Sequence, residues 1–213
     1  DTISAHIVDN DGWLCADLNI TKNEDNGCTD PETDVPDPHC PVAGHPGGVG
    51  ELADELFFFF WKDDGDNVYE KGEKIFKKGL TKYLFKGEMW TLADSKKNIW
   101  KLDPLAGGEP IKGNTIRYIG KAWCFGDLYE KPIEQDNKGK LDTKSNGPLK
   151  RGTGFSCSGK DSGNEFQTDG IVADVSFTAV QSRNNNSFTC GEYPKDHEGP
   201  KDDEGGHGGY DRD

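Results

Sequence analysis

The chain lacks the apolar content and the long apolar runs of a membrane-spanning protein. Only 32% of its 213 residues are hydrophobic and only one is methionine, which predicts one β-rich domain with long loops rather than two domains with separate cores. The longest apolar run, Leu56–Trp61, has the length of a strand and falls far short of the about 20 residues that a membrane helix needs. We therefore expect no membrane partner.

Basic residues are also scarce relative to acidic ones. The 25 Lys and Arg residues against 39 Asp and Glu residues give a formal net charge of -14. A surface of this charge repels phosphate backbones and anionic lipid headgroups. Nucleic acid is therefore not an expected partner.

Motifs that carry catalysis are missing as well. The sequence contains no His-Glu-x-x-His, no Gly-x-Ser-x-Gly and no nucleotide-binding glycine fingerprint. His39, His45, His197 and His207 fall in loops or in the C-terminal tail and are interpreted as surface histidines. Many Asp and Glu residues could form a glycosidase pair, but no feature selects two of them. We therefore expect that the protein is not an enzyme and that it has no small-molecule substrate.

The cysteines indicate an oxidising compartment. None of the six lies in a Cys-x-x-Cys pair, so disulfides are favoured over a zinc site. Asp1 opens the sequence without a methionine or a signal-like segment, which predicts a mature, secreted product. Of the many possible pairings we predict one local bridge, one that ties a long excursion to its strand, and one between early and late strands: Cys28–Cys40, Cys124–Cys157 and Cys15–Cys190.

Alternating apolar residues predict an all-β fold with two sheets packed face to face. In Thr2–Val8 the residues Ile3, Ala5 and Ile7 share one face. Leu56–Trp61 is apolar on both faces, which is typical of a central, covered strand. Further strands are predicted at Ala16–Ile20, Lys74–Phe76, Lys82–Phe85, Trp90–Leu92, Thr115–Phe125 and Ile171–Gln181.

Loops and termini divide the chain into three parts. Residues 1–12 hold the first strand and an Asp9–Gly12 hinge, residues 13–193 form the sandwich, and residues 194–213 are an acidic tail rich in Gly and His. Within the sandwich, 21–50 is expected to be loop, and 126–170 is expected to be a polar surface excursion.

An acidic segment directly after the central strand is the candidate metal site. Hard cations such as Ca²⁺ bind six to eight oxygens from carboxylates and backbone carbonyls, and repulsion among close carboxylates is relieved by a bound cation. The alternative is a solvated acidic turn. The expected Ca²⁺ ligands are Asp63, Asp64, Asp66, the Val68 carbonyl, Glu70 and Glu73.

Two weaker patterns complete the set of candidate sites. The segment Asp161–Asp169 is rich in oxygen ligands but has fewer carboxylates, and it is interpreted as a surface turn. Asn19 and Asn185 begin Asn-x-Ser/Thr sequons and are candidate glycosylation sites.

Several strings in the sequence resemble the camelysin/TasA-like superfamily. They are Phe57–Glu73, Leu105–Glu109, Ile119–Gly126 and Gln167–Cys190, and they are most similar to archaeal and environmental bacterial members with a SipW-type leader. The similarity touches about half of the chain, mainly residues 13–126 and 155–190. The six cysteines, the Asp-rich loops and the acidic tail depart from the best-known bacterial members.

The resemblance implies a jelly-roll sandwich that is exported and polymerises into biofilm-matrix fibres, bundling pili or tubules. In such fibres an N-terminal strand of one subunit completes the sheet of the next, so Ile3, Ala5 and Ile7 become the anchors of a donor strand. We therefore expect an extracellular homopolymer, and the acidic loop adds the expectation that Ca²⁺ stabilises it. Two alternatives are a secreted Ca²⁺-dependent carbohydrate-binding module, with Trp90, Trp100 or Tyr118 exposed on a binding face, and a secreted camelysin-like metallopeptidase.

Overall fold

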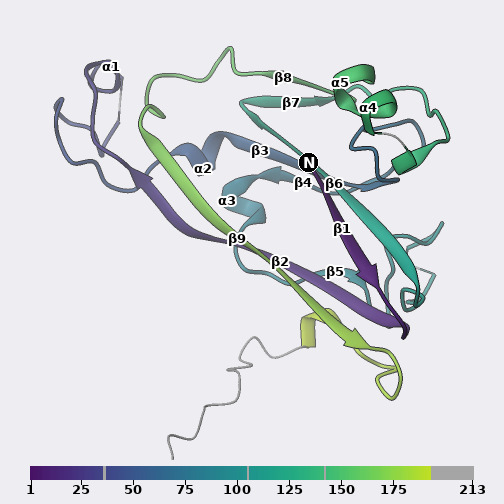
Figure 1. Ribbon diagram of the computed structural model, residues 1–213. Coiled ribbons are helices and arrows are strands. Elements are labelled where there is room, and N and C mark those ends of the chain that lie inside the picture. The colour runs from purple at the N-terminus through teal and green to yellow at the C-terminus, as the bar shows by residue number, and fades with distance from the viewer. Residues whose placement is uncertain (36, 105, 142, 193–213) are drawn as a thin grey trace, which may run out of the picture.

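A computed structural model describes residues 1–35, 37–104, 106–141 and 143–192 of the chain (Figure 1). The fold is mostly β, and every ladder between its named strands is antiparallel. The predicted acidic tail, with His197 and His207, lies outside the described residues.

One sheet has four strands in the order β1-β6-β3-β4. The strands are β1 (Thr2–Ile7), β6 (Thr115–Phe125), β3 (Leu56–Asp63) and β4 (Ile75–Leu80). The apolar run predicted as a central strand is β3, which pairs with β6 on one side and with β4 on the other. β1 lies at the edge.

A second sheet has the order β5-β2-β9, and a third pairs β7 with β8. Here β5 is Trp90–Ala93, β2 is Gly12–Asp25 and β9 is Asp169–Gln181. β2 and β9 run side by side along their whole lengths (Figure 1). The short pair consists of β7 (Asp127–Glu130) and β8 (Phe155–Ser158).

Helices are short and occupy the connections. They are α1 (Asp30–Thr33), α2 (Leu52–Glu55), α3 (Thr81–Leu84), η1 (Gly139–Leu141), α4 (Thr143–Asn146), α5 (Pro148–Arg151) and η2 (Cys190–Glu192). In the part of the chain that is described, no helix has both the length and the apolar character needed to cross a membrane.

The main core lies between the four-stranded and the three-stranded sheets. Leu14 and Leu18 of β2 and Leu92 of β5 meet Phe60 of β3 and Ile119 of β6 in one buried cluster. In β2 the alternation of Leu14, Ala16 and Leu18 places every second side chain on this face, as the sequence pattern predicts.

The other face of β3 has a cover of its own. Phe59 and Trp61 lie on that face, and the ring of Phe155 from β8 packs against both, with centroids 5.2 Å apart in each case. Tyr69 stacks on Phe155 with a centroid separation of 4.9 Å. This second aromatic cluster explains why the run is apolar at every position rather than at alternate ones.

The three disulfides in the structure are the predicted pairs. Cys15–Cys190 ties η2 to β2, Cys28–Cys40 closes the loop after β2, and Cys124–Cys157 joins β6 to β8. Such a set of bridges is typical of proteins from oxidising compartments.

Three expectations are corrected by the structure. The segment expected to be loop from residue 21 onward begins inside β2, which continues to Asp25, and it contains α1. Lys82–Phe85 was expected as a strand, but Thr81–Leu84 forms α3, because Thr81 and Phe85 face inward one helical turn apart and the Phe85 N–H donates to the Thr81 carbonyl at 2.9 Å. A short apolar run fits both the two-residue period of a strand and the 3.6-residue period of a helix, so the sequence pattern does not distinguish them. The segment 126–170 was expected to be a polar surface excursion, but it contains β7, β8, α4 and α5. Its Phe155 side chain belongs to the aromatic cluster that covers β3.

Candidate metal centre

The acidic loop leaves β3 at Asp63 and is folded tightly against β6. Gly65 and Asn67 both have positive φ, at 116° and 65°, a region that favours Gly and Asn. A Cβ at Gly65 would lie 2.6 Å from the Lys140 Cβ and 2.9 Å from the Tyr118 ring. The loop therefore turns back into the protein instead of extending into solvent.

The first half of the site surrounds the end of β3. Asp63 is buried, and its Oδ2 accepts hydrogen bonds from the Thr2 hydroxyl at 2.9 Å and the Gly65 N–H at 3.2 Å. Glu73 reaches back over the loop, where its two carboxylate oxygens accept the N–H groups of Asp64 and Glu70. These bonds hold Asp63, Asp64 and Glu73 close together.

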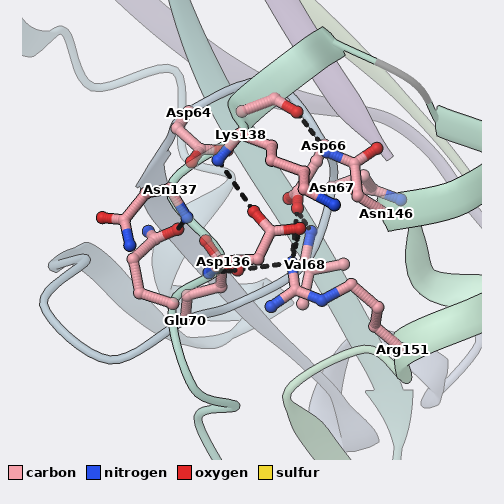
Figure 2. A network of polar contacts seen from close by, with 12 residues as sticks. Asp64, Asp66, Asn67, Val68, Glu70, Asp136, Asn137, Lys138, Asn146 and Arg151 are labelled. Atoms are coloured by element: carbon pink, nitrogen blue, oxygen red, sulfur yellow. Dashed lines mark hydrogen bonds and ion pairs between the residues drawn. The ribbon is translucent and has the colours of Figure 1, made fainter.

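The second half contains Asp66 and Glu70, whose residues are only 1% and 0% exposed. Arg151 of α5 points into this pocket, and its Nη1 lies 2.9 Å from Asp66 Oδ2 and 2.5 Å from Glu70 Oε1 (Figure 2). The same atom is 3.3 Å from Asp136 Oδ2. Among the described residues, each ion pair to this site comes from Arg151, so one cation faces several carboxylates.

Carboxylate oxygens without a donor converge on the loop. Asp63 Oδ1, Asp64 Oδ1 and Glu70 Oε2 are buried and accept no hydrogen bond from the described residues. Ligand atoms of Asp63, Asp64 and Glu73 lie within 4.8 Å of one another, and so do those of Asp64, Asp66 and Glu70. Asp64 belongs to both triads, so the two form one continuous oxygen-rich centre.

The charged form of Glu73 is strongly disfavoured. Burial raises the pKa of its carboxyl to about 9, and the charges of Asp63 and Asp64 act in the same direction. Burial also raises the pKa of Asp63 and of Asp64, in the second case with help from the charge of Glu70. A site with these properties takes up protons or a cation.

The donor set fits Ca²⁺. Hard cations prefer carboxylate and carbonyl oxygens, and the chain brings together all the predicted carboxylates. Val68 is fully buried beside them and its N–H donates to Asp66 Oδ1 at 2.8 Å. Bound there, the ion would supply the positive charge that the unpartnered oxygens lack.

Sequence reasoning missed three members of this centre. Asp136 and Arg151 belong to the 126–170 segment, and Thr2 belongs to β1. Each is more than 60 positions along the chain from the loop residue that it contacts, and no local pattern links them. Only the packing of α5, of β1 and of the loop between β7 and η1, which carries Asp136, places them here.

Replacing Arg151 with Ala is expected to destabilise the metal-free protein by about 3 kcal/mol, because it leaves buried carboxylates without their counter-charge. Ca²⁺ should restore part of the loss. Thermal melts with and without Ca²⁺ measure both effects, and the exposed neighbour Lys150→Ala is the matched control. Equal melting temperatures for the two variants without Ca²⁺ would show that Arg151 does not compensate this centre.

The remaining predicted site residues are dispersed. Asn19 and Asn185 are exposed, as a glycosylation acceptor must be. Trp90 is buried in the main core, so it does not stand on a sugar-binding face, and Trp100 and Tyr118 are half-buried. Within the described residues, no histidine joins a cluster of metal-ligating side chains.

No known protein family matches the chain, and neither does any curated protein or any solved structure. The functional assignment therefore depends on the geometry of the molecule.

Proposed function

We propose that the chain is a structural subunit of an extracellular filament, with a jelly-roll sandwich that polymerises by exchange of its N-terminal strand and is stabilised by Ca²⁺. The observation that carries the proposal is the position of β1. It is the edge strand of its sheet, pairs with β6 alone among the described strands, and is joined to the rest of the chain through an exposed turn.

The contacts of β1 are those that a donor strand uses. Its pairing with β6 runs from Thr2 opposite Gly120 to Ile7 opposite Thr115. Ile3, Ala5 and Ile7 pack against the main core, while Ser4 and His6 are exposed. In the single chain the position beside β6 is occupied by the chain's own β1. In a filament the β1 strand of a neighbouring subunit would occupy the same position.

The turn after β1 is suited to act as a pivot. Val8, Asp9 and Asn10 are exposed. Asp11 is fixed, because its Oδ1 accepts the Gly113 N–H and its Oδ2 pairs with Lys112 Nζ, both at 2.9 Å. A swing of β1 would therefore be absorbed over Val8–Asn10 and would leave the sandwich unchanged.

The core of the single chain is incompletely covered near this edge. Val175 and Phe177 of β9 lie on the same face as the core residue Ala173, yet they are 42% and 41% exposed. Together with Leu18 and Phe58, Val175 lines a groove of about 230 Å³ whose rim includes the exposed Trp123 of β6. Apolar surface of this kind favours coverage by another subunit.

Strand docking and the metal centre share a residue. Thr2 at the start of β1 donates to Asp63 Oδ2, and its hydroxyl is 3.2 Å from Asn67 Oδ1. In an exchanged filament the Thr2 of a neighbouring subunit would make these contacts. Ca²⁺ bound by the acidic loop would then order the loop residues that contact the first residue of the incoming strand.

A cysteine pair across the β1–β6 ladder tests the exchange. His6 and Ile116 are directly opposite and both are exposed, and opposed residues on antiparallel strands have a spacing that suits a disulfide. After assembly in Ca²⁺ and oxidation, the His6→Cys/Ile116→Cys variant is expected to give a ladder of covalent oligomers on a non-reducing denaturing gel. Negative-stain microscopy of the same sample should show filaments.

The control places the cysteines where no exchange is proposed. Asn19 and Asp174 are opposite and exposed on β2 and β9, so Asn19→Cys/Asp174→Cys should cross-link within one chain and run as a monomer. If the first variant also runs only as a monomer although filaments are visible, β1 stays in its own subunit and the exchange mechanism is wrong.

A further inference from the structure

A second group of buried and half-buried acidic side chains lies at the opposite end of the molecule. It is formed where the loop around α1 and the turn before α2 meet the first residue of β9, whereas α5 and the first centre lie at the other end (Figure 1). Its carboxylates belong to Asp25, Asp37, Glu51 and Asp169.

Several oxygens in this group are buried without a hydrogen-bond donor. Asp37 is 8% exposed, and while its Oδ1 accepts the N–H groups of His39 and Cys40, its Oδ2 has no partner among the described residues. The same is true of Glu51 Oε2, Asp169 Oδ1 and Asn23 Oδ1. Leaving so many buried acceptors unmatched in one place is costly unless a ligand satisfies them.

Asp25 adds a further oxygen without a proton donor. Its Oδ2 lies 3.0 Å from Cys40 Sγ and 3.9 Å from Cys28 Sγ. The two sulfur atoms form a disulfide and carry no hydrogen, so neither contact is a hydrogen bond. They are not thiolate metal ligands either, which leaves oxygen as the donor type of this group.

The backbone is packed closely around these oxygens. A Cβ at Gly50 would lie 2.7 Å from Asp169 Oδ1, and the Gly50 carbonyl accepts a hydrogen bond from Asn23 Nδ2 at 2.6 Å. Asp169 Oδ2 accepts the Leu52 N–H at 2.7 Å. Asn23, Glu51 and Asp169 are thus held around one turn.

Charge in the group is poorly balanced. Burial, together with the charges of Asp37 and Asp169, raises the pKa of Glu51 to about 7, although His39 acts in the opposite direction. The His39 ring is 3.8 Å from Glu51 Oε1 and is itself partly exposed. A single partly exposed imidazole does not neutralise four acids.

We propose that Asn23, Asp37, Glu51 and Asp169 form a second binding site for a hard divalent cation, Ca²⁺ by its all-oxygen ligands. No three of these carboxylates are as close together as the triads of the first centre, so the ion retains water among its ligands. Its binding fixes residues 37–50 to β2 and to the start of β9. This site is independent of strand exchange and of the first centre.

The test combines calorimetric titration of the full chain with Ca²⁺ and hydrogen exchange. Wild-type protein is expected to bind about two strongly held ions per chain. Glu51→Gln/Asp169→Asn should lose one of them, and Asp64→Asn/Glu70→Gln should lose the other. The exposed Asp174→Asn, which also removes a carboxylate, should bind as wild type does.

Hydrogen exchange provides a local readout, and its measurement on the wild-type protein needs no substitution. Ca²⁺ is expected to slow exchange in residues 37–52 of the wild-type protein and not of Glu51→Gln/Asp169→Asn. Unchanged stoichiometry in that variant, or unchanged exchange of residues 37–52 when Ca²⁺ is added, would overturn the second site. Loss of binding in Asp64→Asn/Glu70→Gln alone would leave only the first centre standing.

Discussion

The metal-free protein is expected to lose thermal stability as the pH rises from about 5 to about 9, and Ca²⁺ is expected to remove this loss. Glu73 is the main cause, because burial raises the pKa of its carboxyl from the ordinary 4.5 to about 9. Between these values the folded chain holds a proton that the unfolded chain has released. The stabilising contribution is therefore complete below about pH 4.5 and disappears as the pH rises through 9.

Ca²⁺ has the opposite pH dependence. Its carboxylate ligands must be deprotonated, so its affinity increases with pH over the same range. At a hundredfold excess over Kd the ion adds roughly 2.7 kcal/mol, or about 5–10 °C in Tm for a chain of this size. The difference between the melting temperatures with and without Ca²⁺ should thus be small near pH 5 and largest near pH 9.

Melts of chelating-resin-treated protein, recorded from about pH 5 to 9 with and without added Ca²⁺, measure this directly. Glu73→Gln should flatten the metal-free profile, since it replaces the titrating group with a neutral one of the same shape. Asp174→Asn, at an exposed position, should leave the profile unchanged. A metal-free profile that rises with pH, or one that Ca²⁺ shifts equally at every pH, would contradict the prediction.

Removal of residues 1–9 is expected to abolish filaments while leaving a folded monomer. The deletion takes away Ile3, Ala5 and Ile7, whose burial against the core is worth roughly 1.5–3 kcal/mol for each large side chain. It also exposes the Thr115–Gly120 edge of β6. Fusing Thr2–Val8 to the C-terminus of the deletion variant should restore assembly.

A pair of charge variants separates the anchoring face from the exposed face of the same strand. Ile3→Asp/Ile7→Asp should prevent assembly, because it places charges against the core. Ser4→Asp/His6→Asp adds the same number of carboxylates on the exposed face and should still form filaments. Negative-stain microscopy and analytical ultracentrifugation distinguish these outcomes.

Two results would change the assignment of β1. Filaments of normal width from the deletion variant would show that β1 is not the donor. A deletion variant that does not fold as a monomer, and is not rescued by the fused peptide, would show that β1 belongs permanently to its own sheet.

The sequence alone determined the strands whose signal is local. Thr115–Phe125 has the predicted bounds, and Leu56–Trp61 lies at the centre of its sheet as predicted. The disulfide pairs also followed from the order of strands and loops. The acidic residues of the candidate metal centre are close in the chain, so a short segment was enough to suggest it.

Tertiary structure decided what depends on distant contacts. Thr81–Leu84 became helical because its inward residues face the core one helical turn apart. Arg151, Asp136 and Thr2 reach the first centre only because α5, the loop between β7 and η1, and β1 pack beside it. In the second site, Asp169 begins β9 while Asn23 is in β2, and the antiparallel pairing of these strands joins them. Burial then converts scattered acidic residues, which would be solvated in an extended chain, into oxygens that require a cation or a proton.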